Sequence, residues 1–63
     1  MSDADHEAAS SLRIASYRTR ARQLRALAMA LTSQQARTMI LETAQDYERM
    51  AVSLERQVEA HKD

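Results

Sequence analysis

The strongest constraint in this sequence is an apolar pattern that occurs twice, thirty residues apart. Each copy places a tyrosine, an alanine, a leucine and a small apolar residue at spacings of four, three and four: Tyr17, Ala21, Leu24, Ala28, and then Tyr47, Ala51, Leu54, Val58. These spacings align the four side chains along one face of an α-helix. Because the 63 residues include no glycine and no proline, few positions would end a helix. The sequence therefore predicts an all-α protein of two long helices packed against each other.

A short polar run at residues 31–35 separates the two apolar segments. Thr32 and Gln35 have the spacing of a capping box, in which the threonine hydroxyl accepts from the third amide of the helix. We predict a first helix over about residues 3–31, a turn over about 31–33 and a second helix over about 33–61, in a single domain of residues 1–63. Ser2 is the preferred cap of the first helix. Ser10 is the alternative and would leave the first nine residues frayed.

A turn this short makes the two helices antiparallel. We predict a hairpin core of Ile14, Tyr17, Ala21, Leu24, Ala28, Ile40, Ala44, Tyr47, Ala51 and Leu54. With the turn at Thr32, residues at equal distances from it should lie opposite each other: Leu24 with Ile40, Ala28 with Ala36, Tyr17 with Tyr47, Arg18 with Asp46, and Arg22 with Glu42. The two ion pairs would specify the register of the helices, although exposed pairs contribute only about 0–1 kcal/mol each.

Two helices cover only one side of each other, so a hairpin leaves large apolar side chains exposed. We expect six of these to form an interface: Leu12, Leu27, Met39, Leu41, Met50 and Val52. A chain of 63 residues is near the lower limit for independent folding, and without cysteine it has no disulfides. We therefore predict that two copies associate through a self-complementary patch into a four-helix bundle.

Composition and charge exclude several other classes of protein. The formal net charge is zero, so there is no overall attraction to nucleic acids or acidic membranes. No apolar run approaches the roughly 20 residues that span a bilayer. The first residues are acidic and lack the basic and apolar regions of a signal peptide, so we expect a cytoplasmic protein without a membrane partner.

No pattern of residues indicates catalysis or a cofactor. The sequence has no glycine-rich phosphate loop, no cysteine nucleophile and no Ser/His/Asp arrangement, so we predict neither an enzyme nor a bound cofactor. His6 and His61 would lie at the open end of the hairpin among the carboxylates of Asp3, Asp5, Glu7 and Asp63. That set could hold a metal ion, but solvated residues at frayed termini are the commoner explanation.

Five arginines lie between residues 13 and 25 without an acidic residue among them: Arg13, Arg18, Arg20, Arg22 and Arg25. On a helix they spread around the circumference, and no aromatic residues interleave with them for base stacking. We interpret them mainly as a solvated face that sets the register, so a nucleic-acid partner is not our leading expectation.

A longer pattern runs through both predicted helices: Tyr17-Arg18-x2-Ala21-x2-Leu24-Arg25-x-Leu27-Ala28 and then Arg37-x2-Ile40-Leu41-x2-Ala44-x2-Tyr47-x2-Met50-Ala51. It resembles short helical proteins of alpha-proteobacteria, many of them uncharacterised, over about residues 17–55. Typical relatives have an acidic or proline-containing turn where this chain has residues 32–35. The resemblance implies a bacterial cytoplasmic setting and no mechanism.

The sequence therefore predicts a small non-enzymatic structural or protein-interaction module that forms a homo-oligomeric helical bundle. Two alternatives stay open. One is a small nucleic-acid-associated regulator that uses the arginines of the first helix. The other is a subunit that folds on a different protein partner, which would then cover the apolar face.

Overall fold

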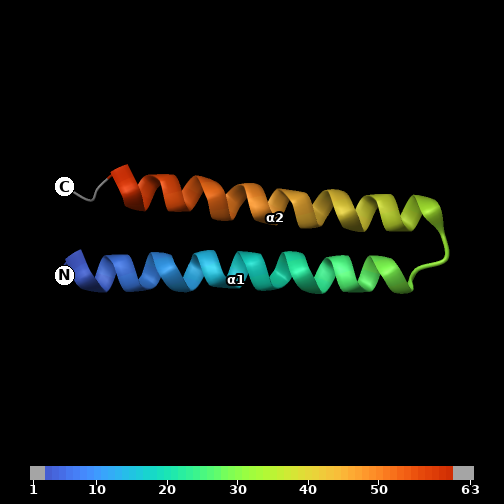
Figure 1. The fold of residues 1–63 in the computed structure, drawn as a ribbon, viewed down its shortest axis with the longest axis horizontal. Helices are drawn as coiled ribbons and strands as arrows, with labels where there is room; N and C mark the ends of the chain where they lie inside the picture. The colour runs from blue at the N-terminus through green and yellow to red at the C-terminus, as the bar shows by residue number, and fades with distance from the viewer. Residues whose placement is uncertain (1–2, 61–63) are drawn as a thin grey trace.

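The computed structural model describes the backbone of residues 3–60 and the side chains of residues 8–60. Helix α1 runs over Asp3–Ala30 and helix α2 over Gln34–Ala60. The two helices pack side by side and antiparallel, with the turn at one end of the molecule (Figure 1). The prediction of an all-α protein with two packed helices is confirmed. The association of two hairpins into a bundle stays a prediction.

The first helix begins at Asp3, so the longer of the two predicted helices is the correct one. Ser10, the alternative cap, lies inside α1 and is buried, with 7% of its surface exposed. It stands four residues before Ile14 on the face that meets α2, where a small side chain fits between close helices. The preferred cap, Ser2, lies outside the described residues.

The cap of α2 is Ser33, and the prediction of Thr32 was wrong. Ser33 Oγ accepts a hydrogen bond from the amide of Ala36 at 3.3 Å. The Ser33 carbonyl accepts the first helical bond of α2 from the amide of Arg37 at 3.0 Å. A cap side chain reaches the second or third amide of its helix, and with Gln34 as first residue the third amide is that of Ala36. The guanidinium of Arg37 also donates to the carbonyl of Leu31 at 2.9 Å, which ties the turn to α2.

Alanines make up the fully buried part of the contact between the helices. Among the described residues, the buried apolar side chains are Ala21, Ala28, Ala44 and Ala51, each at most 1% exposed. Within each helix the two alanines are seven residues apart, the repeat that keeps one helix facing another along its length. We call these four residues the alanine seam. Small side chains at such positions let the two backbones approach closely.

Larger residues of the predicted core flank the alanine seam and are half-buried: Ile14, Tyr17, Leu24, Ile40, Tyr47 and Leu54. Together with the seam and Ser10 they form one continuous stripe on each helix. The rings of Tyr17 and Tyr47, predicted to be neighbours, have centroids 6.2 Å apart and are tilted by 39°. This separation is within the range of aromatic contacts.

The cross-helix ion pairs differ from the predicted ones. Arg18 pairs with Glu55 and Arg25 pairs with Glu48. Asp46, the predicted partner of Arg18, instead lies 3.8 Å from Arg49 on its own helix.

The predicted pairs matched residues by their distance from the turn and ignored the side of the stripe on which each residue lies. Arg18 directly follows a stripe residue, Tyr17, as Glu55 follows Leu54. In an antiparallel pair, residues that follow the stripe on either helix lie on the same side of the hairpin. Asp46 precedes Tyr47 and therefore lies on the other side. Glu42 is two residues from the stripe in both directions and points outward, away from Arg22.

Candidate functional site

All six residues predicted to form an interface are exposed on the single hairpin: Leu12, Leu27, Met39, Leu41, Met50 and Val52. A seventh large apolar residue, Met29, is 88% exposed and was missing from the predicted set. Its position directly after the buried Ala28 is the sequence signal that would have added it. The described residues include no large side chain that is fully buried. Among the described residues, the apolar side chains that are fully buried are thus alanines, while seven large ones are exposed.

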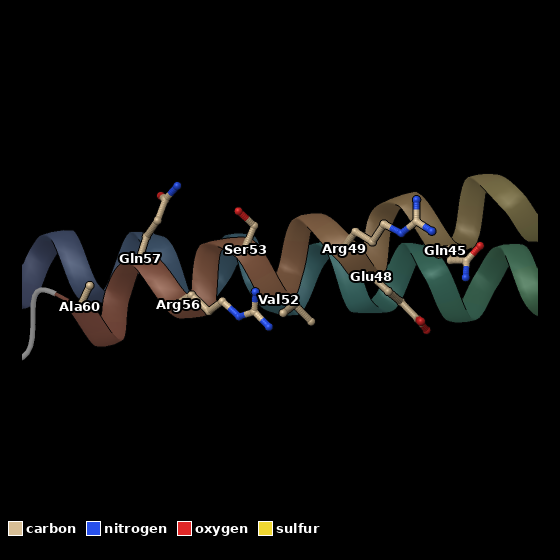
Figure 2. Close-up of a pocket in the computed structure, with 8 residues that line it drawn as sticks. All are labelled: Gln45, Glu48, Arg49, Val52, Ser53, Arg56, Gln57 and Ala60. Carbon is tan, nitrogen blue, oxygen red and sulfur yellow. The ribbon is translucent and has the colours of Figure 1, made fainter.

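The stripe divides the surface of the hairpin into two sides. Residues that directly follow a stripe residue form the ion-pair side, whose charged and large apolar members are Arg18, Arg22, Arg25, Met29, Leu41, Glu48, Val52 and Glu55. Residues that directly precede one form what we call the Leu27 side, whose charged and large apolar members are Arg13, Arg20, Leu27, Met39, Asp46 and Met50. Figure 2 shows the separation on α2, where Glu48 and Val52 project from one edge and Ser53 and Gln57 from the other.

On the ion-pair side, oppositely charged side chains connect the two helices. Arg18 donates to Glu55, and one heptad along α1 Arg25 pairs with Glu48. The hydrogen bond from Arg25 holds the pKa of the Glu48 carboxyl below its ordinary value of 4.5, and the same contact raises the pKa of Arg25. These side chains are roughly 40–50% exposed, so each pair contributes little to stability. The pairs fix the register of α1 against α2.

The Leu27 side has a different composition. Its charged and large apolar residues on α1 are Arg13, Arg20 and Leu27, and its α2 residues nearest the turn are Met39 and Thr43. No ion pair between the helices occurs on this side among the described side chains. Leu27 and Met39 are 48% and 62% exposed. The side is therefore apolar near the turn and carries charges that no cross-helix partner neutralises.

Charge is also distributed unevenly along the length of the hairpin. The chain has nine basic and nine acidic residues, and residues 26–41 contain only one of them, Arg37. The same segment contributes four of the seven exposed large apolar residues: Leu27, Met29, Met39 and Leu41. The turn end of the hairpin is thus its least charged and most apolar surface.

The grooves on the described surface are shallow and open. One of them is lined by α2 alone, with Gln45, Arg49, Ser53 and Arg56 among its side chains (Figure 2). The side chains in Figure 2 splay outward and do not converge on a common point. Ligand sites in proteins are concave and bury most of the ligand, so this groove lacks the shape of one.

Two smaller grooves lie one on each side of the stripe. The first is lined by Arg18, Arg22, Glu48 and Val52, on the ion-pair side. The second is lined by Tyr17, Ser53, Leu54, Gln57 and also Met50. Each groove takes residues from both helices, which supports the division of the surface into two sides.

The described residues contain no group of three His, Cys, Asp or Glu side chains that could hold a metal ion. The candidate ligands His6 and His61, together with the carboxylates around them, have side chains outside the described part of the chain. Within residues 3–60, neither helix is long and apolar enough to cross a bilayer.

Compared with known proteins, the chain matches no family model, no curated protein and no solved structure. The resemblance to short alpha-proteobacterial helical proteins and the cytoplasmic location both stay predictions from the sequence. The arguments for function therefore rest on the surface of the hairpin.

Proposed function

We propose that this chain is a small non-enzymatic protein-interaction module that self-associates into a helical bundle and offers its charged outer surface to a protein partner. The observation that carries the proposal is the inverted burial of the hairpin. Its fully buried apolar residues are all alanines, while seven leucine, methionine and valine side chains are exposed. Such a set of exposed residues is typical of a surface that another polypeptide covers.

The total accessible surface supports the same proposal. The chain exposes 5165 Å², whereas a compact monomer of 7.2 kDa would expose about 4,100 Å². The excess is about 1,000 Å², comparable to the roughly 800 Å² that one partner buries in a standard protein interface. The elongated shape, 48 × 16 × 12 Å, is the origin of this excess.

The small core also favours association, because it provides little burial free energy to stabilise a single hairpin. Burial of an alanine contributes less than about 1 kcal/mol, whereas burial of a leucine or methionine contributes about 1.5–3 kcal/mol. Ordering each residue costs about 1–2 kcal/mol in conformational entropy. A seam of four alanines offsets little of that cost. Burial of the exposed large residues between two hairpins would add further stabilising free energy.

We further propose that the chain has no catalytic activity. Catalysis requires titratable groups with shifted pKa values in a site that excludes water. Among the described side chains, the two groups whose pKa values are shifted, Arg25 and Glu48, form an exposed ion pair on the surface. An arginine that is paired in this way is a structural contact and not an acid or base.

The nucleic-acid alternative has less support than the protein-interaction module. Two of the five arginines between residues 13 and 25, Arg18 and Arg25, are held by glutamates. Arg22 donates to the hydroxyl of Thr19 at 3.3 Å. Titration into labelled duplex DNA should show no binding below about 10 μM near physiological salt. Submicromolar binding that weakens sharply with salt, and is lost in Arg13→Ala/Arg20→Ala, would favour the regulator instead.

The oligomeric state of the purified chain tests the proposal. Light scattering between about 1 and 100 μM should give the mass of a dimer, with strong helical circular dichroism. A folded monomer across that range would contradict self-association. A chain that is monomeric and largely unfolded alone would favour the remaining alternative, a subunit that folds on a different protein.

A further inference from the structure

The Leu27 side has features of an interface that complements itself. Leu27 lies three residues from the end of α1, and Met39 lies five residues after the start of α2. Arg20 and Asp46 lie ten and twelve residues from the same two helix ends. Within each pair, the distances from the turn differ by only two residues, or about 3 Å along the helix axis. Leu27 and Met39, both apolar, are thus nearly level with each other along the hairpin. The cation Arg20 and the anion Asp46 are nearly level in the same way.

We propose that the Leu27 side is the interface of a homodimer, in which two hairpins lie face to face with their turns at the same end. The occupant of this surface is a second copy of the chain. This inference rests on the self-association proposed above and adds to it the side that is buried and the orientation of the two copies.

Charge complementarity supports the orientation with the turns together. The twofold axis then runs along the hairpins, and α1 of each copy faces α2 of the other. Leu27 lies opposite Met39 of the second copy, and Arg20 lies opposite Asp46 of the second copy. On its own chain Asp46 has only the exposed 3.8 Å contact with Arg49 among the described ion pairs, and this contact does not connect the two helices. The symmetry repeats both contacts. One side of the hairpin thus supplies two apolar contacts and two oppositely charged pairs.

The orientation with the turns at opposite ends brings like charges together. If two hairpins overlapped over their full length in this orientation, α1 would face α1 of the other copy and α2 would face α2. The twofold axis would then pass the midpoint of α1, between residues 16 and 17, and the midpoint of α2, at residue 47. Arg13 would then lie opposite Arg20 of the second copy, and Asp46 would lie within about 3 Å, along the axis, of Asp46 of the second copy. Leu27 and Met39 would face the charged half of the partner. Like charges at these positions disfavour that arrangement.

The ion-pair side is a poorer interface for two copies. Arg18 and Arg25 already have partners on their own chain, Glu55 and Glu48. Burying these pairs would remove four charged groups from water in each copy and would form no new pair. Residues Met29, Leu41 and Val52 on that side therefore stay exposed in the proposed dimer and are available to a different protein.

A matched pair of leucine variants tests which side is buried. Leu27 and Leu41 are 48% and 42% exposed, both belong to the turn half of the hairpin, and lie on opposite sides. By sedimentation equilibrium, Leu27→Glu should raise the dimer dissociation constant at least about 100-fold, since the symmetry removes the buried leucine twice. Leu41→Glu should change it less than about threefold. Met39→Glu provides a second variant on the Leu27 side should Leu27→Glu lose helicity.

Spin labels at the turn and near the open end of α1 test the orientation. The chain has no native cysteine, so Thr32→Cys and Ala8→Cys each carry one label per copy. Pulsed electron resonance should give a separation of at most about 30 Å at both sites, because a four-helix bundle is only two helices wide. A fully overlapped dimer with opposed turns would separate the Thr32→Cys labels by more than about 40 Å. A dimer overlapped only at the turns would separate the Ala8→Cys labels by more than about 60 Å.

The outcomes separate this inference from the proposed function. A wild-type monomer at about 100 μM would overturn both. A dimer that is weakened by Leu41→Glu and not by Leu27→Glu, or one with a long distance at either label, would overturn this inference and leave self-association intact. Weakening by Leu27→Glu together with short distances at both ends would establish it.

Discussion

The alanine seam and the exposed apolar residues show opposite relations between size and burial. Ala44, in the middle of the seam, is completely buried, whereas Leu27 is half-exposed and Met29 almost fully exposed. In a self-sufficient domain the large apolar residues would occupy the interior. The contrast separates two sets of residues: small side chains set the close approach of the helices within one chain, and large side chains stay exposed on the single hairpin, where the proposed dimer would bury part of them.

The largest expected effect is at the seam. Ala44→Leu inserts three carbons where the helices are closest, and overpacking of this kind costs about 1–3 kcal/mol of unfolding free energy. Ala26→Leu, on the exposed surface of α1, is the matched control and should change that free energy by less than about 0.5 kcal/mol. Urea denaturation of both variants gives the comparison. Equal effects would mean that the helices do not approach closely at Ala44.

The next effect is at the turn, which holds the two halves of the seam together. Ser33→Ala removes the side chain that caps α2 and should reduce the unfolding free energy by about 1 kcal/mol. Thr32→Ala, one residue earlier, should have almost no effect, because no hydrogen bond of the cap involves it. Thermal or urea unfolding distinguishes the two variants. A larger loss in Thr32→Ala would restore the cap originally predicted from the sequence.

A smaller effect is expected for charges on the Leu27 side. Arg20→Asp or Asp46→Arg alone should weaken the dimer by about fivefold, since the symmetry removes two exposed ion pairs and each contributes about 0.5 kcal/mol, within the usual range of about 0–1 kcal/mol. The double variant Arg20→Asp/Asp46→Arg should recover most of the loss, because the cross-chain pair is formed again in reverse. Sedimentation equilibrium of the three variants gives the dimer dissociation constants of a double-mutant cycle. Purely additive losses would show that these residues do not meet across the dimer.

The smallest effect is on the ion-pair side and depends on pH. Because Arg25 holds the pKa of Glu48 below 4.5, this pair stabilises the fold fully above that pH. The contribution is lost as the pH falls through the lowered pKa of the folded state. The raised pKa of Arg25 keeps the guanidinium charged throughout this range.

As the pH is lowered, the unfolding free energy of Glu48→Gln should therefore decrease slightly less than that of the wild-type chain. Urea denaturation between about pH 2.5 and 7 measures the difference. Glu42→Gln, which alters a carboxylate outside the ion pairs, serves as the control. A steeper acid dependence in Glu48→Gln would mean that the pair with Arg25 does not stabilise the fold.

The sequence carried enough information for the hairpin because spacing and composition agree. The repeated stripe, the absence of glycine and proline, and the polar run at residues 31–35 together leave two packed helices as the simplest arrangement. The contact of Tyr17 with Tyr47 followed from placing the turn at residue 32. The stripe was accessible because it depends on local spacing, and the two helix ends at the turn each differ from the predicted ones by one residue.

The ion pairs were missed because distance from the turn is only one of two coordinates on a helix. Arg18 and Asp46 fit by distance but lie on opposite sides of the stripe, and Glu55 lies on the correct one. The cap was displaced by one residue because Thr32 and Ser33 both carry a suitable hydroxyl. The candidate interface was recognisable from the sequence, whereas its division into two sides required the stripe to be placed residue by residue.

The concentration dependence of thermal unfolding tests the central claim most directly. If the large exposed residues are buried between two chains, the unfolding midpoint should rise by about 10 °C between 1 and 100 μM chain. Leu27→Glu should abolish most of that rise, and Leu41→Glu should preserve it. A helical chain whose midpoint stays constant over this range would show that the alanine seam alone sustains the fold, and would contradict the account.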